Sequence, residues 1–186
     1  MVKNYNQVLR QNETIDLEKI VLRKYVTEDA NDLLEFTSDE KVLEYVGWRQ
    51  EGNKTIEDAL SSIHDYLLSR PGIWAIELKS NKKCIGTIDL RILEDNDKAD
   101  FGYMLHRDFW GQGIMTSALS AVIDLAFAKL DLNRVEANYY IGNEGSGRVM
   151  EKCGMIKEGL RLKGVKIKDK YFDIVLYGIL KENYEK

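Results

Sequence analysis

The sequence predicts a single α/β domain with one mixed, mostly antiparallel sheet flanked by helices, and three observations support this fold class. Between residues 73 and 105, three short alternating runs are joined by polar turns, as in an antiparallel meander. Residues 114–130 are apolar around much of the helical circumference, which indicates a helix buried on more than one side. A further strand follows this helix, so the strand–helix–strand unit places two strands parallel.

Composition limits the domain count and the classes of partner. The chain has 186 residues, 44% of them hydrophobic, and neither a linker nor a repeat interrupts it, so we expect one domain over residues 1–186. Its 27 basic and 31 acidic side chains are interspersed, and this net charge of −4 does not favour a nucleic-acid partner. Without a long apolar run or a secretory leader, a cytoplasmic protein with no membrane partner is expected.

The cysteines and histidines form no recognisable metal pattern. Cys84 and Cys153 are far apart and belong to no Cys/His cluster, so reduced structural thiols and no metal are expected. His64 and His106 are the only histidines, and neither has the partners of a nucleophilic triad.

The first half of the chain is predicted to contain one strand and two helices between residues 17 and 70. A strand is expected over residues 17–26, followed by a helix for which Thr27 is the N-cap and Glu28 and Asp29 form an acidic first turn. Thr55, with Asp58 three residues later, opens a second helix that runs to about residue 69.

The remaining elements follow in order along the chain. The meander strands are Ile73–Leu78, Cys84–Ile92 and Lys98–Leu105, and a loop over 106–113 leads into the buried helix 114–130. The next elements are a strand over 134–141, a helix over 144–152 that ends at Gly154, and two closing strands over 155–165 and 171–180.

The segment from Trp110 to Thr116 carries the first chemical signal. It contains Gly111-Gln112-Gly113 and lies between a strand and the N-terminus of the buried helix. A helix N-terminus presents unpaired amides and a partial positive charge, and glycines let a phosphate approach the main chain. The segment therefore suits a pyrophosphate, although a Gly-x-Gly pair alone is most often a turn.

Other short motifs lie downstream at characteristic distances. They are Asn143-Glu144-Gly145-Ser146, Glu151-Lys152-Cys153-Gly154 and Glu158-Gly159, with Gly102-Tyr103 before the loop and Asp173 near the end. Residues 99–180 closely resemble the GNAT acetyltransferase superfamily, most of all its ribosomal-protein alanine N-acetyltransferases. The first half resembles them more loosely, and the resemblance implies substrate-side elements over about residues 17–70, among them Trp48 and the helix after Thr55.

The resemblance implies a role for each candidate residue. Acetyl-CoA is the implied cosubstrate, its pyrophosphate held by the amides of the Gly111–Thr116 segment and its pantetheine arm paired with the strand end before the loop, where one amide polarises the thioester. The implied cofactor contacts are Met104, Leu105, His106, Gly111, Gln112, Gly113, Met115, Thr116 and Asn143. Ser146 is implied as the acid that protonates the departing thiolate, and Asp100 as the general base.

Several of these roles have structural alternatives. Asp100 also reads as a solvated strand residue, Ser146 as a helix N-cap, and Trp110 as an anchor for its loop. Gln112 stands where many members carry Lys or Arg, so one favourable charge near the phosphates is missing. Met150 replaces a tyrosine acid common in the superfamily, which argues against the polyamine-acetylating branch.

The expected function is acetyl-CoA-dependent N-acetylation, with the N-terminal α-amine of a protein or peptide as acceptor. A small-molecule amine and a non-catalytic acyl-CoA sensor are the alternatives. A dinucleotide-binding oxidoreductase is disfavoured because Thr116 replaces the third glycine and Asp131 precedes the next strand rather than ending it. The sequence leaves the acceptor and a homo-oligomer open.

Overall fold

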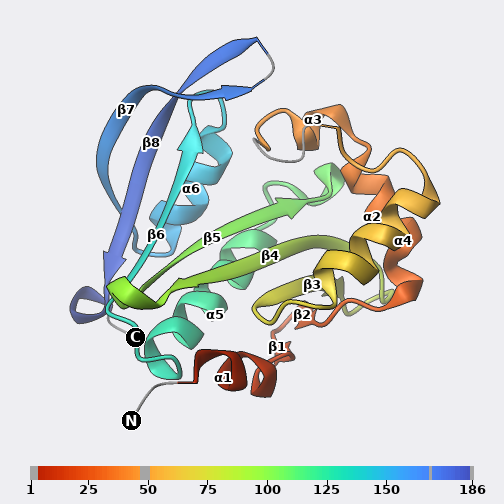
Figure 1. The fold of residues 1–186 in the computed structure, drawn as a ribbon, viewed down its shortest axis with the longest axis horizontal. Helices are drawn as coiled ribbons and strands as arrows, with labels where there is room; N and C mark the ends of the chain where they lie inside the picture. Colours follow the sequence, from red (N-terminus) through yellow and green to blue (C-terminus); the bar gives the residue numbers. More distant parts are fainter. Residues whose placement is uncertain (1–3, 47–50, 168, 185–186) are drawn as a thin grey trace.

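The computed structural model describes residues 4–46, 51–167 and 169–184. These residues form an eight-stranded sheet of order β1-β2-β3-β4-β5-β6-β8-β7 (Figure 1). The strands are β1 Ile15–Asp16, β2 Ile20–Arg23, β3 Ile73–Leu78, β4 Cys84–Leu93, β5 Lys98–Leu105, β6 Arg134–Tyr140, β7 Ile156–Ile167 and β8 Lys170–Leu180. The helices are α1 Tyr5–Gln11, α2 Ala30–Thr37, α3 Glu40–Leu43, α4 Ile56–Ser62, α5 Ile114–Ala128 and α6 Glu144–Lys152.

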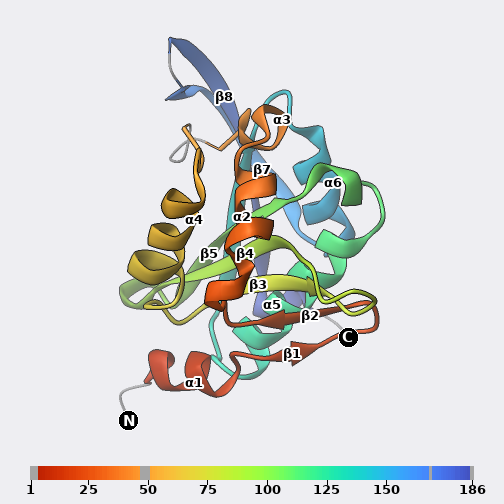
Figure 2. The ribbon, with the colours of Figure 1, turned by 90° about the vertical axis from the view of Figure 1, so that its right-hand side faces the viewer.

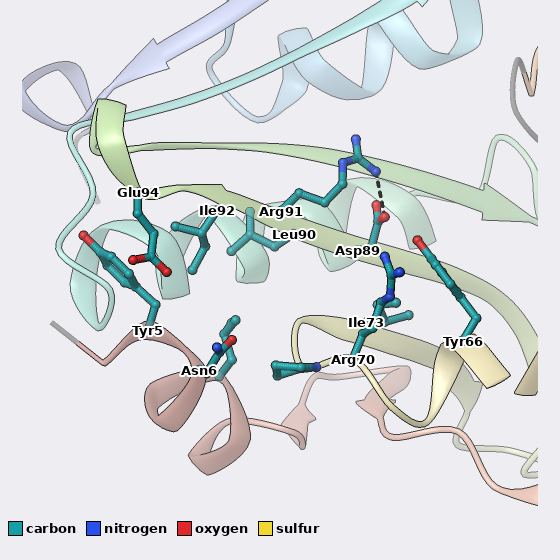
Figure 3. Close-up of a pocket in the computed structure, with 12 residues that line it drawn as sticks. Tyr5, Asn6, Tyr66, Arg70, Ile73, Asp89, Leu90, Arg91, Ile92 and Glu94 are labelled. Atoms are coloured by element: carbon teal, nitrogen blue, oxygen red, sulfur yellow. Dashed lines mark hydrogen bonds and ion pairs between the residues drawn. The ribbon is translucent and has the colours of Figure 1, made fainter. Parts of the chain in front are cut away.

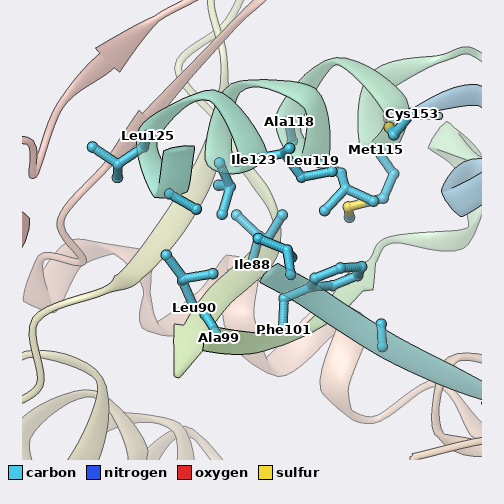
Figure 4. Packing of buried hydrophobic residues seen from close by; sticks show 14 of the residues in the cluster. Ile88, Leu90, Ala99, Phe101, Met115, Ala118, Leu119, Ile123, Leu125 and Cys153 are labelled. Carbon is cyan, nitrogen blue, oxygen red and sulfur yellow. The ribbon is translucent and has the colours of Figure 1, made fainter. Parts of the chain in front are cut away.

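The sheet lies between two helical layers. Figure 2 shows α4 and α6 on opposite sides of it. The larger buried cluster joins α5 to one face, where Leu119 and Ile123 of α5 are fully buried near Ile88 and Leu90 of β4 (Figure 4). A second cluster packs α2 and α4 against the other face. Because α5 is apolar around most of its surface, it is held rigidly against the sheet, and its N-terminus is fixed relative to β5.

The central prediction is confirmed. Strands β3, β4 and β5 form an antiparallel meander, and β6 returns parallel to β5 after α5. Helix α6 ends at Gly154, whose φ is 80°. There the Gly154 amide donates to Glu151 O at 3.0 Å and the Met155 amide to Met150 O at 3.1 Å, which is the hydrogen-bond pattern of a Schellman motif.

The predicted helix after Thr55 is present but changes its winding. The Thr55 hydroxyl accepts from the Asp58 amide at 3.2 Å, and the Asp58 carboxylate accepts from the Thr55 amide at 3.0 Å, so the expected capping box is formed. After Ser62 the helix continues as a π-helical turn, Ile63–Leu67, in which the Leu68 amide donates to Ile63 O at 2.9 Å.

The strand predicted over residues 17–26 is present but shorter, as β2 Ile20–Arg23, and a turn takes up its predicted start. The Leu17 amide donates to Ile20 O at 3.0 Å, which closes a tight turn between β1 and β2, and β2 ends at Arg23. The turn residues Glu18 and Lys19 carry no glycine, proline or asparagine signal, so the pattern read as continuous.

Two helix starts also differ from expectation. Asp29, not Thr27, organises the start of α2: its carboxylate accepts from the Val26 amide at 2.9 Å and binds Arg23. Helix α1 was not predicted, although Asn4 caps it by accepting from the Gln7 amide at 3.1 Å. In the part of the chain that the structure describes, no helix is long and apolar enough to cross a membrane.

Candidate functional site

The N-terminus of α5 is open and glycine-lined. Gly111 and Gly113 have φ values of 73° and 78°, in the left-handed region that favours glycine. A β-carbon built at either position would meet no atom within 4 Å. Gly113 is the N-cap residue, no side chain caps the helix, and its first turn carries no acidic residue. The protein itself therefore leaves this helix end unneutralised.

The amides around this helix start are free to bind an anion. Among the described residues, none of the amides from Gly111 to Thr116 donates a hydrogen bond to a protein acceptor, and the Ser117 amide is the first that does, to Gly113 O at 3.0 Å. Clustered amides at the positive end of a helix dipole are a favourable site for a phosphate group.

Side chains of the loop hold it in shape. The Trp110 indole donates to Leu105 O at 2.8 Å, although half of this side chain is exposed, so a hydrogen bond anchors it more than burial. The side-chain amide of Gln112 donates back to Asp108 O at 2.8 Å. Gln112 therefore stabilises the loop with its side chain and offers only its main chain to an anion.

Strands β5 and β6 pair over only a short distance. Their parallel register covers Lys98–Asp100 of β5 and Arg134–Glu136 of β6, after which the strands diverge (Figure 1). Strand β5 remains paired with β4 along its whole length. The second half of β5 therefore has an edge on the β6 side that no strand occupies.

The register of β5 shows which amides face that edge. It also reduces the number of main-chain contacts that the sequence predicted for the end of β5. The His106 amide donates to Ile85 O of the β4 side at 2.8 Å. Since main-chain groups alternate in direction along a strand, those of Met104 also face β4, whereas those of Tyr103 and Leu105 face the opening. Of the implied contacts Met104, Leu105 and His106, only Leu105 therefore directs its amide to the opening. The Leu105 carbonyl is already bound by the Trp110 indole.

The start of α6 lies across the opening from β5. Asn143 is the N-cap residue, but its side chain makes no capping hydrogen bond. Ser146 is the third residue of the helix, so its alternative reading as an N-cap is wrong. The Tyr103 hydroxyl donates to the Ser146 carbonyl at 3.3 Å, and burial raises the pKa of Tyr103, which keeps this donor protonated.

Cys153 ties the two helices together. Its buried thiol donates to Thr116 O at 3.5 Å, which links the end of α6 to the first turn of α5. Burial raises the pKa of this thiol to about 11, so it stays neutral and serves structure, as the sequence indicated for both cysteines.

Asp100 lies away from the helix end. Its carboxylate binds Arg91 Nε at 2.7 Å, on the face of the sheet shared with Met104. Leu105 is five positions further along the strand, which corresponds to about 16 Å at roughly 3.3 Å per strand residue. The structure therefore brings Leu105, Asn143, Ser146 and the Gly111–Thr116 segment around one opening and leaves Asp100 at a distance.

A group of aromatic residues lies near the end of β6, on the face of the sheet that also carries Asp100 and Met104. Tyr140 and Phe172 lie with ring centroids 6.3 Å apart, and Tyr45 meets Phe172 edge-on, also at 6.3 Å. These residues come from β6, β8 and the segment after α3, and sequence reasoning missed all three because only the fold brings them together. Trp48, expected on this substrate side, lies outside the described residues.

The histidines and acids form no metal site within the described parts of the chain. His106 Nε2 lies 3.0 Å from Glu35 Oε1, and its Nδ1 accepts from the Asp108 amide at 3.2 Å. His106 therefore links α2 to the loop before α5 and acts as a structural residue there.

Comparison with known proteins agrees with this geometry. The model of the acetyltransferase (GNAT) domain family matches residues 19–156. The chain is 31% identical to the uncharacterized N-acetyltransferase p20 of Bacillus licheniformis over 92% of this chain and 98% of that protein. It is 33% identical to the ribosomal-protein-serine acetyltransferase of Escherichia coli over 50% of this chain and 52% of that protein.

A solved structure gives the same result for the fold. The GNAT-family acetyltransferase of Bacillus anthracis superimposes with a TM-score of 0.82 and 26% identity, covering 91% of this chain and 99% of that one. The open helix end, the diverging strands and the matched family model lead to one conclusion: the chain belongs to the GNAT acetyltransferase family and is an N-acetyltransferase.

Proposed function

We propose that this enzyme transfers the acetyl group of acetyl-CoA to the N-terminal α-amine of a protein or peptide. The observation that carries the proposal is the unneutralised N-terminus of α5 beside the open edge of β5. A diphosphate at the helix end and an extended thioester arm along the strand edge are the two parts of acetyl-CoA that such an arrangement fits.

The donor side uses main-chain groups. The amides of Gly111, Gln112, Gly113, Met115 and Thr116 bind the pyrophosphate, and the pantetheine arm pairs with the β5 edge at Tyr103 and Leu105. The Leu105 amide then donates to the thioester carbonyl, where negative charge develops as the amine attacks. Met104 and His106 flank this amide and hold it in place through their bonds to the β4 side.

The acceptor side favours an α-amine. An α-amine has a pKa of about 7.7–8.0, against about 10.4 for lysine, so more of it is neutral near pH 7 and less base strength is required. The Escherichia coli relative is named for acting on a ribosomal protein, which supports a protein acceptor. The aromatic side chains of Tyr45, Tyr140 and Phe172 offer apolar surface to the residues that follow the amine.

A competition assay tests the acceptor. Three acceptors are offered with acetyl-CoA: a peptide that starts with Ala or Ser, the same peptide N-blocked but carrying a lysine, and spermidine. We expect the highest kcat/KM for the free N-terminus. A preference for the blocked peptide or for spermidine would contradict the acceptor assignment and leave the family assignment intact.

Two residues at the start of α6 are expected to separate binding from turnover. Asn143→Ala should raise the Kd of acetyl-CoA about tenfold, because its side chain makes no capping bond and is available to the cofactor. Ser146→Ala should keep that Kd and lower kcat, because its proposed role is to protonate the leaving thiolate. Calorimetry and steady-state kinetics measure the two effects. Normal turnover in Ser146→Ala would mean that water supplies the proton.

A further inference from the structure

An ionic cluster lies on the face of the sheet that α2 and α4 cover, between Leu105 and the start of β5. Asp89 and Arg91 of β4 stand opposite Gly102 and Asp100 of β5. Arg91 donates to both carboxylates, from Nη1 to Asp89 Oδ2 at 2.7 Å and from Nε to Asp100 Oδ1 at 2.7 Å. Arg91 is therefore shared between an inner carboxylate, Asp89, and an outer one, Asp100.

The inner carboxylate, that of Asp89 on β4, binds the main chain of the neighbouring strand β5. Asp89 Oδ1 accepts from the Gly102 amide at 2.6 Å. A β-carbon at Gly102 would lie 2.9 Å from this oxygen and 3.1 Å from Arg91 Nη1, so the absence of a side chain there makes room for both groups. Gly102 is three residues from Leu105, about 10 Å along the strand, whereas Asp100 is five residues and about 16 Å away.

The two carboxylates differ in their surroundings. The Asp89 side chain is 12% exposed and that of Asp100 is 38% exposed. Burial raises the pKa of Asp89 in spite of its bonds to Arg91 and Gly102. If Asp89 gains a proton, Arg91 still pairs with Asp100, so the net charge of the three side chains changes from −1 to zero.

A cavity gives Asp89 a route to solvent. It has a volume of about 230 Å³ and runs along β4 from Asp89 and Arg91 to Glu94 and α1 (Figure 3). Tyr66 and Arg70 line it beside Asp89, with the Arg70 guanidinium 4.2 Å from the centre of the Tyr66 ring. A cavity of this size and polarity admits several water molecules, through which a proton can leave.

We infer that Asp89, rather than Asp100, accepts the proton that the acceptor ammonium loses before it attacks the thioester. This inference rests on the proposed acetyl transfer to an amine. One ammonium proton passes to Asp89, directly or through one water, and then to solvent through the cavity. The neutral amine forms the C–N bond as the C–S bond breaks, a second proton ends on the CoA sulfur, and the third stays on the amide nitrogen.

Matched variants test the inference. Asp89→Asn is expected to lower kcat about 100-fold or more at pH 7, while Asp100→Asn changes it less than about threefold. The Asp89→Asn enzyme lacks this proton acceptor, so only acceptor molecules that have already lost the ammonium proton to solvent can react. Its kcat should therefore rise about tenfold per pH unit up to the amine pKa near 8. A purely structural role would lower kcat equally at every pH. The Kd of acetyl-CoA should stay unchanged in both variants.

Two further measurements do not depend on Asp89→Asn folding. Carboxyl NMR titration of the ligand-free wild type should place the pKa of Asp89 above the ordinary value of about 3.9. Gly102→Ala keeps the carboxylate but displaces it, and should lower kcat without changing the Kd of acetyl-CoA.

The inference is overturned if Asp89→Asn keeps wild-type kcat, or if Asp100→Asn shows the large loss instead. A failure of the acceptor assignment is a separate result. If the wild type prefers a small amine to a peptide, the same variants are compared with that amine, because the role of Asp89 requires only an ammonium group.

Discussion

Replacing Gly113 with alanine is expected to weaken acetyl-CoA binding about 100-fold, or about 2.7 kcal/mol. The φ of Gly113 is 78°, where a β-carbon costs roughly 1–2 kcal/mol, and the space beside it is open. That space is where the proposed pyrophosphate lies, so the added methyl group, or the main-chain shift that relieves its strain, moves the amides away from the phosphate oxygens. Calorimetric titration with acetyl-CoA measures the loss.

Gly154→Ala is the matched control. Gly154 has nearly the same conformation, with φ of 80°, and a β-carbon there would make an ordinary 3.6 Å contact with Ile179 Cδ1 at the end of α6. Both variants should lose a similar amount of stability, and only Gly113→Ala should lose affinity. Equal affinity in both would place the pyrophosphate elsewhere.

Asp29→Ala is expected to lower the free energy of unfolding by about 3 kcal/mol or more. Asp29 is 4% exposed and accepts two hydrogen bonds from the Arg23 guanidinium, each 2.7 Å long. Removing it leaves Arg23, whose side chain is 19% exposed, with Glu77 as its only carboxylate partner and the Lys24 carbonyl as a further acceptor, and also removes the acceptor of the Val26 amide. Urea denaturation followed by circular dichroism measures the change.

Asp16→Ala tests whether burial is the reason. Asp16 also pairs with a cation, Lys79, but its side chain is 72% exposed, so its loss should cost less than about 1 kcal/mol. Comparable losses in the two variants would show that the Arg23–Asp29 pair contributes no more than a surface ion pair. The effect on function should be indirect, because α2 carries Glu35, which binds His106 beside the loop that leads into α5.

The parts of the site that were predictable have local signals. The Gly111–Thr116 segment combines glycines with the start of an apolar helix, so its conformation and its open amides follow from neighbouring residues. The meander and α5 follow from periodicity in the same way. The hairpin of β1 and β2 lacks a turn residue, and α1 has only seven residues, too short for a clear period.

The proposed proton acceptor, Asp89, was harder to predict because its environment depends on pairing between strands. Asp89 reads in the sequence as an ordinary polar residue of an alternating strand. Its burial comes from the register that sets it opposite Gly102 and beside Arg91. The direction of the β5 amides likewise depends on the bond between His106 and Ile85, which no local pattern reveals.

Along β5, main-chain amides point to the edges of the strand and side chains point to the faces of the sheet, so mutation affects the two proposed sites differently. The proposed donor site uses main-chain amides, which almost every substitution leaves in place, so a change of side chain rarely abolishes it outside the two glycines. The proposed acceptor site is instead made of side chains from several elements, including Asp89, Tyr140 and Phe172. Mutation can therefore alter the choice of amine gradually while the acetyl donor stays the same, and one scaffold can diverge to new acceptors without losing its activated substrate.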